Sequence, residues 1–497
     1  MTTVRSALLP SLIALLVAGA CREARDPGLN RGTTVVMAVP DAGALQPDQW
    51  QNLDFLMFLP LATLNEHGEL EGRLARSWEP STDFKELTYH LRTDVRWDDG
   101  EPVTARDVKF TVDLVAQYDD EYTGYSATIV DDSTVRIGAP RPDYIDDIVY
   151  YPEHLLKSLD RRKFWEWDFW THPVGNGPFR FVRYLPGRLI EFEANPGYYK
   201  GKPRIQRLIL KFVGEAGLTE LLSGNVDMAR GEDSQVPLIA NDARFSIHRV
   251  LNSPAIPIYW KADHPLFRDP RVRLALTHAL DRSELLRVMN LPPDALIIDA
   301  IVRRRQLRRR DWPEPLAYDT AFARTLLEAA GWVDRDGDGI LDKDGRPFRF
   351  TASVESGPGI EKMAVYVQAQ LRRVGVQMDI QLHDAAIMWG KLGAGDFEAW
   401  MHLHYPWALR KDFGRGNPLR YANEEAFDLI ERLEHTADPD EADRVSDKIS
   451  ETFRADPPMV RLIQVSTAWF VHRRIRGLNT PFHVSPAMRM EDLWVEN

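Results

Sequence analysis

The sequence predicts an α/β protein with two main lobes, a smaller inserted subdomain and a hinge between the lobes. At 497 residues the chain is longer than one hydrophobic core usually serves, so several lobes are expected. Segments of helical periodicity also take turns with alternating strands, as where a helix over 360–374 precedes a strand over 376–382. The composition, 44% hydrophobic and 27% charged, is that of an ordinary soluble globular protein.

The formal net charge of −12 bears on the choice of partner. Phosphate binding needs a basic surface, so nucleic acid is not expected as a general partner.

The first residues predict an export signal over 1–21. Arg5 provides the positive start, an apolar run follows, and small residues precede Cys21, the only cysteine. The apolar run is shorter than the roughly 20 residues that span a bilayer. This arrangement resembles a bacterial lipobox, which implies that Cys21 is acylated; ordinary signal cleavage beside a stray cysteine is the alternative. Residues 22–32 are polar and contain Pro27 and two glycines, so we expect a tether.

The mature fold begins with a β-branched strand near residue 33, and residues 72–80 are expected to form a short helix closed by a proline. Asp98, Asp99 and Glu101 lie around a tight Asp-Gly turn. Adjacent carboxylates on a turn point apart into water, so a solvated turn is expected rather than an acid–base pair.

The stretch 173–203 predicts a β-hairpin. Gly175 and Gly177 permit positive φ, Pro178 stops a helix, and a Pro-Gly pair ending at Gly187 joins two alternating runs. The runs 173–181 and 195–203 resemble the signature of the family 5 solute-binding proteins, the oligopeptide- and dipeptide-binding receptors of ABC importers. Further motifs of that family are matched in the expected order: 74–79, 91–110, 218–229 and 264–282. The resemblance covers nearly all of 33–497.

The resemblance implies a periplasmic-binding-protein-like fold of type II. Lobe I would comprise 33–60, 172–262 and 478–497, the inserted subdomain 61–171, and lobe II 263–477. The two crossings that form the hinge are expected near 261–263 and 477–480.

The implied activity is capture of a small peptide or peptide-like solute by lobe closure, followed by docking on an ABC permease. No covalent chemistry and no cofactor are needed. The receptor would be a monomer in the periplasm or at the cell surface, held to the membrane by its lipid anchor.

The cargo site is expected on and beside the strand 397–406. In peptide-binding relatives an Asp of this strand grips the peptide's ammonium group, but this chain has His404 there. The predicted ligand-binding residues are Trp389, Trp400, Met401, His402, His404 and Tyr405. Aromatic rings suit a partly apolar ligand.

His402 and His404 point the same way on a strand and could share a metal or a metal chelate. The alternatives are therefore a metal-chelate receptor or a secreted metal-dependent hydrolase that uses both histidines. The sequence contains neither His-Glu-x-x-His nor Gly-x-Ser-x-Gly, which disfavours the hydrolase. A sensory or structural lipoprotein that has kept the fold is a further alternative.

Two charged stretches have open roles. Asp334, Asp336 and Asp338 match the first half of a calcium loop, but the twelfth position is Gly345 instead of Glu. Calcium is therefore a weak expectation here. The run 303–310 contains six arginines, which indicates either a solvated loop near acidic groups or an anion site for carboxylate or phosphate cargo.

Overall fold

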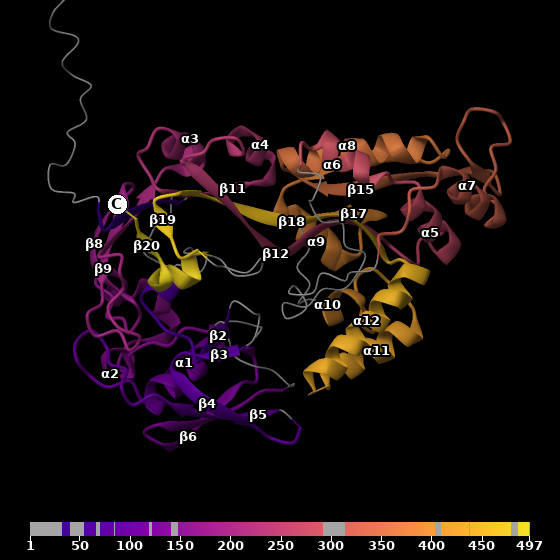
Figure 1. Ribbon diagram of the computed structural model, residues 1–497. Coiled ribbons are helices and arrows are strands. Elements are labelled where there is room, and N and C mark those ends of the chain that lie inside the picture. The colour runs from indigo at the N-terminus through magenta and orange to yellow at the C-terminus, as the bar shows by residue number, and fades with distance from the viewer. Residues whose placement is uncertain are drawn as a thin grey trace, which may run out of the picture.

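A ten-stranded sheet runs through the middle of the protein (Figure 1). The computed structural model describes residues 32–39, 54–65, 70–83, 85–118, 122–140, 148–291, 314–402, 409–436, 438–478 and 486–496. The strand order across the sheet is β16 (Gln377–His383), β15 (Arg349–Glu355), β17 (Ala399–Met401), β12 (Phe245–Trp260), β18 (Met459–His472), β11 (Met228–Glu232), β1 (Thr34–Val39), β10 (Arg207–Phe212), β9 (Leu189–Ala194) and β8 (Phe179–Leu185).

The long antiparallel strands β12 and β18 join the two halves of this sheet. Val250 and Trp469 belong to the first core, which also contains β1, whereas Ile256 and Leu462 belong to a second core. The pairing of the two strands is irregular between Leu251 and Ala255 and again beside Pro257. The chain thus passes from one half to the other within the continuous strands β12 and β18. Both crossings come earlier in the sequence than the positions 261–263 and 477–480 that the sequence predicts. Strand pairing across the junction makes separate connecting loops unnecessary there.

The first core combines the β8–β11 end of the sheet with a separate four-stranded sheet. That sheet has the order β4 (Ala75–Pro80), β5 (Glu86–Leu91), β7 (Thr134–Gly138) and β6 (Ser126–Asp131), and α1 (Ala105–Tyr118) lies against it. The helix expected over 72–80 is wrong, because this segment is β4. Trp78 on β4 stands opposite Tyr89 on β5, and strand pairing satisfies the backbone.

Several short α-helices and β-strands accompany these larger elements. They are β2 (Ala62–Leu64), β3 (Leu70–Gly72), α2 (Glu153–Leu156), α3 (Gly217–Leu222), α4 (Val236–Ile239), β13 (Asp342–Lys343), β14 (Arg346–Pro347), β19 (Ile475–Arg476) and β20 (Trp494–Val495).

The predicted hairpin is present as β8 and β9, but its two leading glycines serve another purpose. Neither Gly175 nor Gly177 has a positive φ, so that expectation is wrong. A Cβ at Gly175 would lie 2.3 Å from the Met57 carbonyl oxygen, and one at Gly177 would lie 2.6 Å from the Met57 carbonyl carbon. The Gly177 amide donates to the Met57 oxygen at 2.7 Å. Glycine is needed here for close backbone approach, whereas the turn residue Gly187 does have a positive φ of 66°.

The Asp98 carboxylate connects three of the sequence motifs. It accepts hydrogen bonds from Arg180 Nε at 2.8 Å, from the Gly175 amide at 3.2 Å and from Asn195 Nδ2 at 3.3 Å. Burial raises the pKa of Asp98 to about 6, although the Arg180 charge opposes the shift. The expected solvated turn is therefore wrong for Asp98, whose neighbours come from a distant part of the chain.

The other half of the sheet has helices on both faces (Figure 1). One face forms the second core with α5 (Pro270–His278), α6 (Arg282–Val288), α7 (Thr320–Ala329) and α8 (Pro358–Arg372). The opposite face forms a third core with α9 (Ala385–Ala394), α10 (Leu409–Phe413), α11 (Glu424–Glu434) and α12 (Pro439–Ala455). Strand alternation sends neighbouring side chains to different cores.

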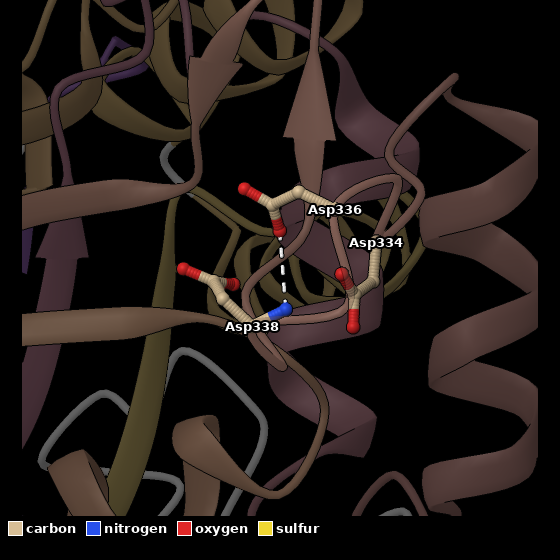
Figure 2. Close-up of side chains that lie close together, drawn as sticks. All are labelled: Asp334, Asp336 and Asp338. Atoms are coloured by element: carbon tan, nitrogen blue, oxygen red, sulfur yellow. Dashed lines mark hydrogen bonds between the residues drawn. The ribbon is translucent and has the colours of Figure 1, made fainter.

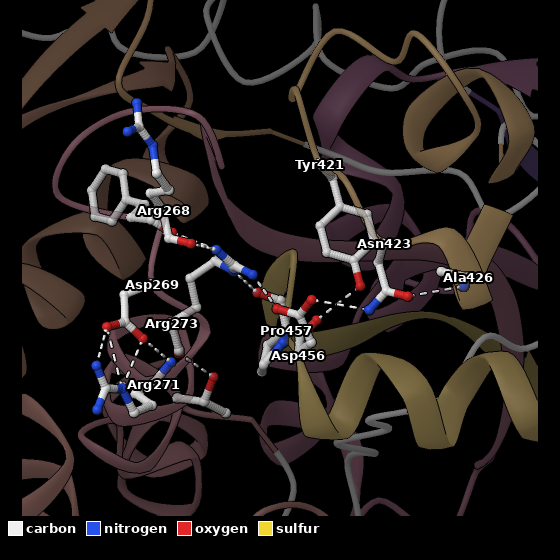
Figure 3. A network of polar contacts seen from close by, with 11 residues as sticks. Arg268, Asp269, Arg271, Arg273, Tyr421, Asn423, Ala426, Asp456 and Pro457 are labelled. Carbon is white, nitrogen blue, oxygen red and sulfur yellow. Dashed lines mark hydrogen bonds and ion pairs between the residues drawn. The ribbon is translucent and has the colours of Figure 1, made fainter. Parts of the chain in front are cut away.

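A buried polar network fastens the α11–α12 pair to α5 (Figure 3). The Arg273 guanidinium on α5 pairs with the Asp456 carboxylate and donates to the Pro457 carbonyl at 3.1 Å. Asn423, which caps α11, donates to the other oxygen of Asp456 at 3.0 Å, and the Tyr421 hydroxyl donates to the Asp456 carbonyl at 3.1 Å. One arginine thus holds together the end of α12, the start of β18 and the first turn of α11.

Candidate ligand-binding site

Three aromatic rings surround the imidazole of His402. Tyr259 stacks on it with ring centroids 5.8 Å apart and planes 26° apart. Trp389 and Trp400 meet it edge-on, at 5.2 Å and 5.6 Å. His402 follows β17 directly and is half-buried. Residues of α9, β12 and β17 thus form a cluster of aromatic rings around His402.

The predicted site residues do not all lie together. Trp389, Trp400 and His402 are in contact, but Trp400 is buried in the third core. Met401 is also buried and points to the opposite face, into the second core. His404, Tyr405, Cys21 and the arginine run 303–310 lie outside the described residues.

Tyr259 was missed by sequence reasoning. It is the register partner of Trp400 across β12 and β17, and it lies in the third core. Only long-range strand pairing brings it to His402, so no local pattern in the sequence identifies it.

The exposed part of the cluster is provided by α9. The helix begins at Asp384, whose Oδ1 accepts from the Ile387 amide at 2.9 Å, and ends at Gly395 in the left-handed conformation. Met388 is buried, but Ile387 and Trp389 are 52% and 53% exposed. Residues two positions apart on a helix face different directions, so Trp389 is the exposed ring of α9 that contacts the His402 cluster.

Two opposite charges act on the buried hydroxyl of Tyr259. Burial raises the pKa of Tyr259 well above its usual range, and the nearby Asp412 carboxylate raises it further. The Arg461 guanidinium lowers it. Arg461 is only 5% exposed and lies on β18 opposite Pro257. A buried cation and a carboxylate therefore both lie near the aromatic cluster.

The three aspartates of the calcium-like loop do come together (Figure 2). One carboxylate oxygen from each of Asp334, Asp336 and Asp338 lies within 4.8 Å of the others, and all three residues are exposed. Their oxygens accept hydrogen bonds from loop amides, for example Asp334 Oδ1 from Gly337 at 2.8 Å. The short hairpin β13–β14 follows in place of a second helix. Calcium binding stays a prediction.

Among the described residues, no other trio of His, Cys, Asp or Glu side chains lies close enough to hold a metal ion. His402 therefore has no metal-ligand cluster within those ranges. Nor does any helix in the described ranges have the length and apolarity to cross a bilayer.

Comparison with known proteins identifies relatives along most of the chain. The Bacillus subtilis oligopeptide-binding protein AppA is 28% identical over 315 residues, which are 59% of this chain and 57% of that protein. The chain thus spans less than two thirds of the length of this curated relative.

Solved structures share the fold. The Listeria monocytogenes ABC transporter substrate-binding protein CtaP has a TM-score of 0.78 at 19% identity, covering 93% of this chain and 99% of that one. NikZ from Campylobacter jejuni, in complex with Ni(L-His), has a TM-score of 0.74 at 22% identity, covering 93% and 99%. The predicted type II periplasmic-binding-protein fold is therefore confirmed. The model of the bacterial extracellular solute-binding proteins, family 5 Middle, matches residues 69–423, and the chain belongs to this family.

Proposed function

We propose that the protein is the substrate-binding receptor of an ABC importer and captures a peptide or peptide-like small solute for a membrane permease. Family membership and the peptide-binding name of the Bacillus subtilis relative support this function. The observation that carries it for this chain is the exposed Trp389 ring set against the His402 cluster. Flat rings of this kind bind a partly apolar solute by contact and desolvation.

The mechanism is population shift without covalent change. The half of the protein that contains the first core closes against the half that contains the second and third cores. Cargo that touches both lobes only in the closed form stabilises that form, which then docks on the permease. The receptor undergoes no chemical change when it releases the cargo.

The cellular setting follows from the same proposal. The family is extracellular, which supports a location in the periplasm or at the cell surface. Residues 1–21 act as the export signal, Cys21 carries the lipid, and 22–32 tether a monomeric receptor to the membrane.

The test is native mass spectrometry of the mature protein purified without denaturation. A retained peptide-like mass on the wild type is expected. A variant in which Trp389 is replaced by alanine should retain at least tenfold less. Protein that carries no solute, and binds no member of a tripeptide pool, contradicts the proposal.

A metal chelate is the second candidate cargo. Two observations favour it: the half-buried imidazole of His402 lies within an aromatic cluster, and the similar NikZ structure contains Ni(L-His). In the same mass spectra, a retained mass with the nickel isotope pattern, lost in His402→Ala, would establish this cargo instead of a peptide.

A further inference from the structure

A side chain at the end of α6 reaches across to the other half of the protein. Asn290 follows α6, and its Nδ2 donates a hydrogen bond at 3.3 Å to the carbonyl oxygen of Ser234. Ser234 belongs to the short helical turn η7 (Asp233–Gln235), which leads into α4. Whereas α6 packs in the second core, α4 belongs with β1 and β11 to a fourth core. The hydrogen bond thus connects the two halves outside the paired strands β12 and β18.

The end of α6 holds Asn290 in a defined conformation. Its φ is 56°, in the left-handed region that asparagine tolerates better than most residues. The Asn290 amide donates to the Arg287 carbonyl at 3.1 Å. The next amide, of Leu291, donates to the Leu286 carbonyl at 2.8 Å, as is usual where a helix ends in this way. The Asn290 side chain therefore projects from an ordered helix end.

The contact lies on the side of the sheet that faces away from the candidate ligand-binding site. Figure 1 shows α4 and α6 on one side of the paired strands β12 and β18, and α9 on the other. Both η7 and α6 contact β18. The helix α9 carries Trp389, which meets His402 in the aromatic cluster. The paired strands thus separate the Asn290 contact from the aromatic cluster.

Rotation about the paired strands moves their two sides in opposite senses. The pairing is interrupted between Leu251 and Ala255, where the strands can bend. When two rigid halves turn about an axis within these strands, groups on one side approach while groups on the other side separate. Closure around cargo on the α9 side must therefore lengthen the distance from Asn290 to Ser234. At 3.3 Å this hydrogen bond is already longer than usual, so a small rotation breaks it.

We propose that Asn290 and Ser234 form a brace behind the hinge that favours the open receptor. This inference rests on the proposed receptor function and deepens it by naming a contact that regulates closure. Cargo that closes the two halves must break the brace. Because apparent affinity falls with the fraction of the receptor in the closed form, the brace makes cargo binding weaker than the cargo contacts alone would make it. The brace forms again when the receptor opens, which favours cargo release.

The variant Asn290→Asp tests the brace with almost no change in shape. A carboxylate cannot donate to the Ser234 carbonyl, and aspartate also tolerates the left-handed conformation. Loss of one hydrogen bond should shift the equilibrium about threefold toward the closed form. We therefore expect the mature full chain to retain a tripeptide pool about threefold better in native mass spectrometry. The control Asn225→Asp makes the same exchange at an exposed site after α3 and should leave retention unchanged.

A measurement without cargo separates the brace from the receptor function. Spin labels are attached at Glu79→Cys on β4 and Glu431→Cys on α11, two exposed sites in different halves of the protein. The change Cys21→Ser leaves no other cysteine in the labelled chain. Double electron–electron resonance then gives the distances between the two labels. Asn290→Asp should shift these distances toward shorter values, and so should Asn290→Gly, which removes the side chain and keeps the left-handed conformation.

The distances decide the fate of the brace. An unchanged or longer distance distribution in the Asn290 variants overturns it, whatever their retention of peptides, and leaves the receptor function standing. A wild type that retains no tripeptide overturns the receptor function for peptide cargo, and the label distances then still test the brace. Should Asn290→Asp not fold, Asn290→Gly provides both measurements.

Discussion

The indole ring of Trp389 meets the imidazole of His402 edge-on, with centroids 5.2 Å apart and planes 73° apart. One ring is more than half exposed and the other is held by two further aromatic residues. The contact thus joins a solvent-facing surface to the buried face of the sheet, and it is the place where a variant should alter binding with little effect on stability.

Replacing Trp389 with alanine is therefore expected to weaken retention of the proposed solute at least tenfold and to change the free energy of unfolding by only about 1 kcal/mol. The matched control is Val365→Ala on α8, which packs on the opposite face of the sheet and is 57% exposed. Native mass spectrometry and urea unfolding measure the two effects. Equal losses of retention in both variants would contradict a role for the Trp389 ring.

Removing one partner of the Arg273–Asp456 pair should strongly destabilise the protein. The two side chains are 5% and 19% exposed, so Arg273→Gln leaves a largely buried carboxylate without its cation, at a cost of about 3 kcal/mol. Arg271→Gln is the control, because its pair with Asp269 lies at the surface and is expected to contribute less than about 1 kcal/mol (Figure 3). Urea unfolding of both variants checks the difference, and similar costs would refute the assigned role.

Asp98 should make stability depend on pH in a defined direction. Its folded pKa of about 6 lies above the ordinary value of 3.8, so the folded state binds the proton more tightly than the unfolded state does. The contribution is fully present below pH 3.8 and is lost as the pH rises through 6. The free energy of unfolding of the wild type, minus that of Asp98→Asn, should rise by about 1–3 kcal/mol from pH 7 to pH 4. A difference that stays constant, or falls, over this range would show that the Arg180 charge outweighs burial.

Alanine at Gly177 should be much more harmful than alanine at Gly187. A Cβ at Gly177 meets the backbone of Leu56 and Met57 within 2.8 Å, and we expect a cost of about 3 kcal/mol. At Gly187 nothing lies within 4 Å, so only the positive φ is unfavourable, at about 1 kcal/mol. Thermal unfolding of both variants measures the order. If the Gly187 variant were the less stable, close backbone approach would not explain the glycine at 177.

The sequence predicted those features that depend on local patterns. The strand over 376–382 is present as β16, one residue later, because its apolar alternation is local. The hairpin β8–β9 and its turn at Gly187 were also predicted correctly. The type II fold followed from motifs that the family comparison confirms.

What could not be predicted depends on partners distant in sequence. The local pattern of 72–80 predicts a helix because the pairing of β4 with β5, and the contact of Trp78 with Tyr89, depend on residues outside that segment. Asp98 was expected in water because nothing near it in the sequence indicates that Arg180 and Asn195 cover it. Tyr259 joins the candidate site only through its register with Trp400.

The continuity of β12 and β18 restricts how the two halves of the protein can move. A hydrogen-bonded ribbon resists stretching and sliding, yet it twists easily where its ladder is interrupted, as between Leu251 and Ala255. Each half should therefore rotate as a rigid body about this interruption. The paired strands β12 and β18 bend there and fix the axis of rotation. Side chains close to this axis are therefore displaced little, while the parts of each half that lie farthest from it move most.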